Sequence, residues 1–259
     1  MTRWVRFEHQ GRSEFGTLDD NDNIALHGGD MFVAAVATGN TVPLADVKLL
    51  TPTVPSKMLA LWNNFHALAD KLGTARPEHP LYFMKSPSSF LGTGEVVNRP
   101  AAYAGKVVYE GELGIVIGRT CRNITEAEAD EHIFGYTCIN DITAVELLKA
   151  DASFDHWTRA KSFDGFGIFG PCVATGLDTD TLVIKTVLNG AERQNYPVSD
   201  MILSPRRVVS LLSQDLTLEP GDVICCGTSI GVGSMKEPSN TVDITIDGIG
   251  TLSNVYNNE

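Results

Sequence analysis

Long apolar runs, clustered basic residues and paired cysteines are all scarce in this sequence. No apolar run approaches the roughly 20 residues that a membrane-spanning helix needs, so we expect no membrane partner. The 20 Lys and Arg residues are outnumbered by 32 Asp and Glu, and the resulting net charge of −12 opposes binding to nucleic acid. The cysteines include no C-x-x-C pair, which predicts a reduced, cytoplasmic protein without a disulfide framework. They are Cys121, Cys138, Cys172, Cys225 and Cys226.

The 259 residues, 43% of them hydrophobic, are enough for one large domain with a small appendage. The first fifty residues contain short strand-like pieces separated by Gly, Asp and Asn, and MFVAAVAT at residues 31–38 is their one helical candidate. Two prolines in TPTVPSK, at 51–57, indicate a linker. We therefore expect a small N-terminal domain at residues 1–52 and a main domain at residues 53–259.

Strand signals dominate the main domain. Met58 to Trp62 reads as a strand, and LNG at 188–190 and IDG at 246–248 are typical hairpin turns. Helices are expected at 125–134, where Thr125 and Glu128 match a capping box, and at 205–213, with a short helix or loop at 63–72. This pattern predicts a β-rich α+β fold with a rolled or sandwiched sheet.

The stretch VVYEGELGIVIG, at 107–118, reads as one buried strand that contains two carboxylates. Alternation along a strand places Glu110, Glu112 and Gly114 on one face, and Gly114 is expected to leave space beside the carboxylates. This face is either exposed to solvent, as is common in antiparallel sheets, or binds a cation. Two carboxylates this close would raise the pKa of one of them or attract a cation between them. Oxygen ligands favour Mg²⁺, Mn²⁺ or Ca²⁺ over Zn²⁺. Asp141, in GYTCINDITA, is either a third ligand or a turn residue.

Five motifs in sequence order resemble the fumarylacetoacetate hydrolase family over about residues 55–256. They are YEGELGIVIG, GYTCINDITA, AKSFDGFGIFGP, LNGAERQ and LTLEPGDVICCGTSIGVG. The resemblance implies a mixed β-sandwich roll, a homodimer, and Mg²⁺ or Mn²⁺ bound by Glu110, Glu112 and Asp141.

The substrates implied by the resemblance are small anionic 2-oxo acids. The first expectation is metal-dependent hydrolysis of a C–C bond in an acylpyruvate, such as fumarylpyruvate or maleylpyruvate. The reaction would pass through a metal-stabilised enolate and belong to aromatic catabolism. A decarboxylase or isomerase of a 2-oxo (ene) dicarboxylate, such as oxaloacetate or 2-oxohept-3-ene-1,7-dioate, is the alternative. From another class, a non-catalytic binding protein with the same fold is also considered.

The resemblance also assigns individual site residues. His66 and Lys161 are the expected catalytic residues, and His66 is expected to activate water as a general base. Without the motifs, His66 would read as a structural histidine and Lys161 as a surface lysine. Substrate contacts are expected from Lys85, Lys161, Gly227 and Thr228. Asp70, Asp164 and Gln194 are further candidates for the site.

The sequence departs from the family pattern at two positions. Ala69 replaces the glutamate that follows the histidine by three residues, and Asp70 substitutes for it only in an irregular helix. Val145 replaces an arginine near the substrate, which removes a bidentate carboxylate contact and leaves Arg159 or Arg76 as candidates for that role. The missing glutamate weakens the case for water activation and relatively favours decarboxylation or isomerisation.

Overall fold

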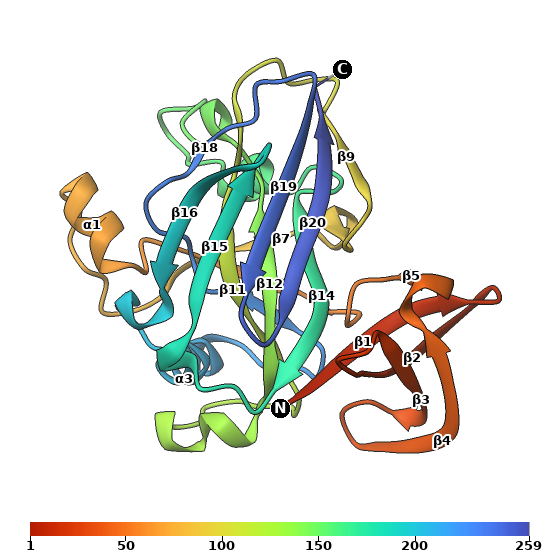
Figure 1. Cartoon of the computed structure of the whole chain (residues 1–259). Helices are drawn as coiled ribbons and strands as arrows, with labels where there is room; N and C mark the ends of the chain where they lie inside the picture. The colour runs from red at the N-terminus through yellow and green to blue at the C-terminus, as the bar shows by residue number, and fades with distance from the viewer. Residues whose placement is uncertain (259) are drawn as a thin grey trace.

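The computed structural model describes residues 1–258, and three sheets account for most of the chain (Figure 1). Ten strands of the twelve-stranded sheet follow one another in space: β4 (Ala34–Pro43), β3 (Asn23–Asp30), β2 (Arg12–Leu18), β1 (Thr2–His9), β14 (Gly167–Thr175), β12 (Ile133–Asp141), β11 (Gly111–Ile117), β17 (Val223–Cys225), β6 (Met58–Trp62) and β7 (Leu81–Lys85). The other two strands lie beside this path, β5 (Lys48–Leu49) next to β1 and β8 (Phe90–Leu91) next to β14. The five-stranded sheet contains β16 (Ala191–Pro197), β15 (Val183–Leu188), β19 (Ser239–Ile246), β20 (Gly250–Asn257) and β9 (Val96–Asn98). The three-stranded sheet contains β13 (Thr143–Ala144), β10 (Val107–Tyr109) and β18 (Gly233–Ser234).

Helices are few and short. The α-helices are α1 (His66–Leu72), α2 (Trp157–Lys161) and α3 (Pro205–Asp215). Six 3₁₀ turns join the strands: η1 (Leu44–Asp46), η2 (Pro87–Ser89), η3 (Glu126–Glu131), η4 (Val145–Leu147), η5 (Thr179–Thr181) and η6 (Val198–Asp200). Within residues 1–258, none of the helices combines the length and the apolar character that crossing a bilayer requires.

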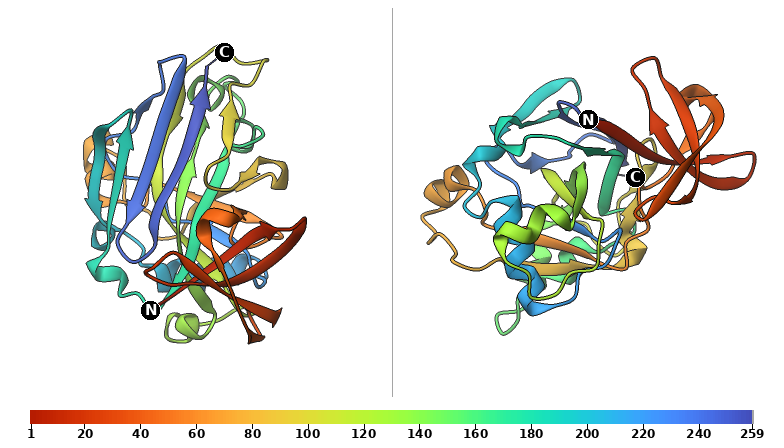
Figure 2. Two further views of the ribbon diagram at one scale, coloured as in Figure 1. Left: turned by 45° about the vertical axis from the view of Figure 1, so that its right-hand side comes forward. Right: turned by 90° about the horizontal axis from the view of Figure 1, so that it is seen from below.

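The core lies between two layers of sheet. Strands β11, β12 and β14 pack against β15, β19 and β20, and the turned view in Figure 2 shows the five-stranded sheet in front of the larger one. Leu113 and Ile115 of β11 point into this core and meet Ile184 and Ile244. The opposite face of β11 is also covered, by a second apolar cluster that includes Val116 and Phe169. These layers confirm the predicted β-rich sandwich.

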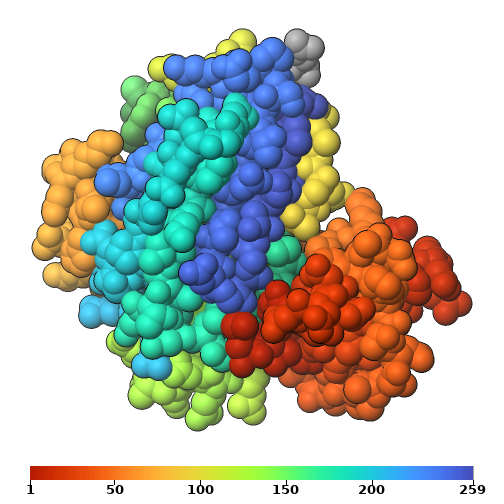
Figure 3. Space-filling view, in the orientation of Figure 1, coloured from red at the N-terminus to blue at the C-terminus, as the bar shows by residue number. Residues whose placement is uncertain are grey.

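The N-terminal strands form a lobe at one side of the molecule (Figure 3, red to orange, lower right). Helix α1 projects from the opposite flank (Figure 1). The lobe is joined to the rest through β1, which pairs with β14 in the register Trp4 to Val173. The large sheet is therefore continuous across residue 52, and the division at that residue stays a prediction.

Several local predictions are confirmed. Strand β6 has the predicted bounds, and Asn189 and Gly190 both have positive φ in the turn between β15 and β16. Helix α3 begins at Pro205, after a Ser204 side chain that caps it, and buries Val208, Val209 and Leu212.

Two helix predictions were wrong. Residues 31–38 lead into strand β4, because their backbone pairs with β3 in a hairpin, and side chains such as Val36 are exposed. The capping box of Thr125 and Glu128 is present, but it starts the 3₁₀ turn η3, and Ile133 already belongs to β12. In the first segment sheet pairing replaces the local helical preference, whereas in the second a short helical turn forms and ends before β12 begins.

Candidate metal centre

The stretch 107–118 is two strands rather than one. β10 ends at Tyr109 and joins the three-stranded sheet, whereas β11 begins at Gly111 in the large sheet. Glu110 lies at the junction, where its carbonyl accepts a 2.9 Å hydrogen bond from the Asp141 N–H. The next residue must be small, since a Cβ on Gly111 would lie 2.1 Å from the Thr186 hydroxyl oxygen. This break places Glu110 at the end of β12, beside Asp141.

The expected space beside Gly114 is filled. A Cβ at this position would lie 2.7 Å from Ile139 Cδ1 and 2.8 Å from Thr137 Cγ2. Both neighbours belong to β12, which pairs with β11. The prediction that Gly114 opens the carboxylate face was therefore wrong; the glycine allows close packing of adjacent strands instead.

Glu110, Glu112 and Asp141 meet on one face of the large sheet. Each offers an oxygen, and these oxygens all lie within 4.8 Å of one another. Glu112 and Asp141 are fully buried, and the Glu110 side chain is 15% exposed. The Thr143 hydroxyl donates a 3.1 Å hydrogen bond to Glu110 Oε1, and the Gly227 N–H donates a 2.9 Å bond to Glu112 Oε2.

Two buried lysines contact these carboxylates. Lys161 Nζ, at the end of α2, lies 2.6 Å from Glu110 Oε2 and 2.6 Å from Asp141 Oδ2. Lys85, from β7, donates to the other oxygen of Asp141 and is 1% exposed. Three carboxylates and two ammonium groups leave one negative charge when all are ionised. A buried uncompensated charge is costly, so the site favours an additional cation.

The pKa values of the cluster show the same imbalance. Burial raises the pKa of Glu112 well above its usual value, and the nearby Asp141 and Glu110 add to the rise. Burial likewise raises the pKa of Glu110, against the opposing effect of Lys161. Burial alone would raise the pKa of Asp141, but Lys161 and Lys85 outweigh it and hold that pKa low. The carboxylate that lacks a lysine, Glu112, is therefore the one whose charge is least compensated.

The donor set fits a hard divalent cation. Glu112 Oε1 is buried and has no hydrogen-bond partner within residues 1–258, which is unusual for a carboxylate oxygen. All three groups offer carboxylate oxygens, the ligands that Mg²⁺ and Mn²⁺ prefer. An ion between them would satisfy the free oxygen and balance the remaining charge.

A polar network holds the loop after β17 against this site. Gln194 Oε1 accepts from the Gly111 N–H at 3.0 Å, and Gln194 Nε2 donates to the Thr228 hydroxyl at 2.8 Å. The Thr228 hydroxyl in turn donates to the Gly111 carbonyl at 3.0 Å. The Gly227 N–H and the Thr228 hydroxyl thus contact protein groups, and their expected substrate contacts stay predictions.

The remaining predicted residues lie apart from this cluster or lack contacts with it. His66 begins α1, and its ring makes no hydrogen bond in the described chain. Asp70 is exposed in a regular helix and pairs with Arg76 at 3.1 Å, while Ala69 is fully buried. Asp164 is exposed beyond α2. The condition under which Asp70 would replace the missing glutamate, an irregular helix, is not met.

Some neighbours of the site were missed by sequence reasoning. Trp157 lies four residues before Lys161 on α2 and therefore on the same face of that helix. Its spacing from Lys161 could have revealed it, but α2 itself was not predicted.

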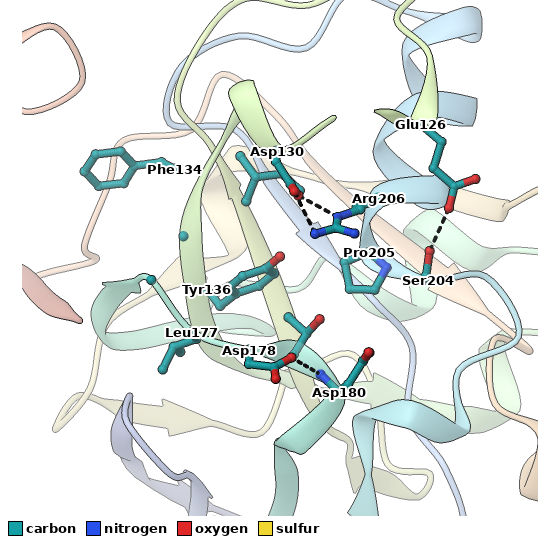
Figure 4. A pocket seen from close by; sticks show the side chains of 14 residues that line it. Glu126, Asp130, Phe134, Tyr136, Leu177, Asp178, Asp180, Ser204, Pro205 and Arg206 are labelled. Atoms are coloured by element: carbon teal, nitrogen blue, oxygen red, sulfur yellow. Dashed lines mark hydrogen bonds and ion pairs between the residues drawn. The ribbon is translucent and has the colours of Figure 1, made fainter. Parts of the chain in front are cut away.

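A different cavity, of about 660 Å³, is lined by none of the three carboxylates Glu110, Glu112 and Asp141. Figure 4 shows its Arg206–Asp130 ion pair and the contact of Ser204 with Glu126.

Comparisons with known proteins agree with this geometry. Residues 57–256 match the family described as fumarylacetoacetate (FAA) hydrolase C-terminal, and residues 2–52 match the Rv2993c-like N-terminal family. The chain is 38% identical to the oxaloacetate tautomerase YisK of Bacillus subtilis over 82% of this chain and 73% of that protein.

Two solved structures show the same arrangement over nearly their whole length. The 2-hydroxyhepta-2,4-diene-1,7-dioate isomerase of Mycobacterium marinum is 35% identical with a TM-score of 0.90, and the match covers 100% of this chain and 99% of that one. A maleylpyruvate hydrolase of Sphingobium sp. SYK-6, in complex with manganese(II) and pyruvate, is 27% identical with a TM-score of 0.80 and 99% coverage of both chains.

Proposed function

Because the chain belongs to the fumarylacetoacetate hydrolase family, we propose that it acts on a small 2-oxo acid and requires Mg²⁺ or Mn²⁺. The observation that supports this proposal is the buried group of three carboxylates with one unpartnered oxygen. A divalent ion held there supplies Lewis acidity to a keto oxygen of the substrate.

The protein's own residues prepare this site. Lys161 fixes Glu110 and Asp141 in one geometry, and Lys85 holds the other oxygen of Asp141. Both ammonium groups are buried; they orient these two carboxylates and hold the pKa of Asp141 low. The polar network of Gln194 and Thr228 fixes the β10–β11 junction through Gly111.

The first candidate reaction is hydrolysis of an acylpyruvate such as fumarylpyruvate or maleylpyruvate. Water, activated by His66, adds to the acyl carbonyl, and the bond between that carbon and C3 of the pyruvate part breaks. Its electron pair passes to the pyruvate enolate, which takes a proton at C3. The products are a carboxylic acid and pyruvate.

Decarboxylation, tautomerisation or isomerisation of a 2-oxo dicarboxylate is the second candidate. The specific observation in its favour is that His66 lacks an acidic partner on α1: Ala69 is buried, and Asp70 pairs with Arg76. These reactions need no activated water. The similarity to proteins named as a tautomerase and an isomerase supports the same alternative.

The test is turnover of fumarylpyruvate, maleylpyruvate and oxaloacetate with Mn²⁺ or with EDTA, using wild type and Glu110→Gln. Pyruvate release and loss of enol absorbance report the reactions, and samples without enzyme correct for spontaneous decay. We expect turnover only with Mn²⁺ and only in wild type. Metal-independent turnover, or full activity of Glu110→Gln, would contradict the proposal.

The homodimer and the cytoplasmic location stay predictions. Light scattering, which measures the molar mass in solution, tests the homodimer.

A further inference from the structure

An apolar cavity of about 760 Å³ lies next to the candidate metal centre. Its lining contains three aromatic side chains, and the central one, Trp157, packs against both Trp62 and Phe83. The Phe83 and Trp157 rings are stacked, with centroids 5.4 Å apart. The other lining residues are Pro80, Leu81, Tyr82, Val145, Leu148, Lys149 and Asp155.

The cavity and the metal centre share the same face of the large sheet. On β7, Phe83 and Lys85 are two residues apart and therefore point to the same side. Phe83 pairs with Ala60 of β6, and Leu81 pairs with Trp62. Along β7 the backbone positions of Phe83 and Leu81 thus lie about 7 Å and about 13 Å from that of Lys85, at about 3.3 Å per residue.

Two further segments link the cavity to the charged cluster. On α2, Trp157 lines the cavity and Lys161, one turn later, contacts Glu110 and Asp141. Lys161 Nζ also lies 5.4 Å from the centroid of the Phe83 ring. After β12, Val145 lines the cavity four residues beyond Asp141. The lining itself includes none of the three carboxylates or the two buried lysines, but Phe83 lies between Lys161 and the cavity, so a ligand longer than pyruvate at the carboxylates would reach the cavity past Phe83.

The one cation in the lining is 75% exposed at the rim and already has a carboxylate beside it, so the interior of the cavity offers no partner for a second carboxylate. Lys149 is the single cationic residue in the lining, and its Nζ lies 2.5 Å from Asp155 Oδ2. Val145 stands where the family resemblance places an arginine. Arg76 pairs with Asp70, and Arg159 is not among the lining residues. A carboxylate in this cavity would lose water without gaining a partner, which is unfavourable.

We propose that this cavity binds the distal end of the substrate and selects a 2-oxo acid with a flat apolar distal group, such as an aromatic ring, over one with a distal carboxylate. This inference rests on the proposed function, because the 2-oxo acid end is taken to lie at the carboxylate cluster. It narrows the substrate class: the acylpyruvates and 2-oxo dicarboxylates named above carry a distal carboxylate, and the same reactions should run more efficiently on a 2-oxo acid with an apolar distal group.

The test compares two ligands that differ only at the far end. They are 4-phenyl-2,4-dioxobutanoate and its 4-(4-carboxyphenyl) analogue, and their affinities are measured by calorimetry with Mn²⁺ present, with pyruvate as a ligand that lacks any distal group. We expect the phenyl compound to bind about tenfold or more tightly than the carboxylated one. Equal affinities, or a preference for the carboxylated compound, would overturn the inference.

The variant Val145→Arg returns a cation to the cavity. It is expected to tighten binding of the carboxylated analogue about tenfold, because a guanidinium pairs with a carboxylate through two hydrogen bonds. Val33→Arg is the matched control, since Val33 is 82% exposed in the N-terminal lobe, and it is expected to change neither affinity.

Two further outcomes separate the possible failures. If pyruvate and both dioxo acids fail to bind with Mn²⁺, the proposed function and this inference are both wrong. If pyruvate binds but Val145→Arg changes the molar mass in light scattering and leaves the affinity ratio unchanged, the cavity is an interface between copies of the chain. That result would overturn the inference and leave the proposed function in place.

Discussion

The ammonium nitrogen of Lys161 lies 2.6 Å from Oδ2 of Asp141, and both side chains are buried. The two residues are 20 positions apart in sequence and belong to a helix and a strand. Burial alone would lower the pKa of Lys161, but Asp141, Glu110 and Glu112 outweigh it and raise that pKa. The raised pKa keeps Lys161 charged at neutral pH, where it compensates the carboxylates in the metal-free protein.

Removing this charge should destabilise the fold. Lys161→Met leaves Glu110 and Asp141 short of one buried partner, and we expect the free energy of unfolding in EDTA to fall by about 3–5 kcal/mol. Urea unfolding followed by circular dichroism measures it. Lys149→Met removes an exposed partner of Asp155 and should cost about 0.5 kcal/mol or less. Equal losses in the two variants would show that the buried pair has no special role.

Glu112→Gln should separate metal binding from apo stability. In wild type, Mn²⁺ at 100 times its dissociation constant adds about 2.7 kcal/mol to the free energy of unfolding. The variant should gain much less, because it lacks the unpartnered ligand oxygen. Glu131→Gln, at an exposed carboxylate, should respond like wild type. Undiminished stabilisation of Glu112→Gln by Mn²⁺ would exclude Glu112 as a ligand.

The same variant gives a pH test in EDTA. The folded-state pKa of Glu112 is raised, so its stabilising protonated form is lost as pH rises from the unfolded-state value toward the folded one. A glutamine resembles the protonated acid and does not titrate. Glu112→Gln should therefore be more stable than wild type at pH 8, and the difference should shrink toward pH 5. A difference that grows as the pH falls would have the wrong sign.

His66→Ala distinguishes the candidate reactions. If His66 activates water, the variant should lose acylpyruvate hydrolysis and keep decarboxylation of oxaloacetate. Both rates are measured as kcat with Mn²⁺ on one preparation. His79→Ala, an exposed histidine in the same connection, is the control. Equal loss of the two activities would contradict a role in water activation.

Asp70→Ala tests whether that carboxylate replaces the missing glutamate. Asp70 is exposed and pairs with Arg76, so we expect kcat/KM to stay within about twofold of wild type, as for most surface substitutions. A loss of hydrolysis comparable to that of His66→Ala, with the fold intact by circular dichroism, would show instead that the two residues act together.

Gly114→Ala tests the close packing of β11 on β12. Its Cβ would lie within 2.8 Å of Ile139 and Thr137, and overpacking of this kind costs about 1–3 kcal/mol. Thermal unfolding in EDTA measures the change. Gly28→Ala is the control, because a Cβ there would meet nothing within 4 Å. An unchanged stability of Gly114→Ala would mean that space does exist beside the carboxylates.

The sequence by itself determined the elements whose signals are local. The hairpin turn at Asn189 and Gly190 needs positive φ, and the amphipathic pattern after Ser204 specifies α3, so both were predictable. The like charges at Glu110 and Glu112, together with the ordered motifs, were also enough to predict a cation site with Asp141.

Only the tertiary structure decided how that site is built. The break at Glu110, the contacts of Lys161 and Lys85 with Asp141, and the packing against Gly114 all join residues distant in sequence, and no local pattern encodes them. The same holds for the segment 31–38, where pairing with β3 replaced a local helical preference. The apolar cavity likewise exists only because β6, β7 and α2 bring Trp62, Phe83 and Trp157 together.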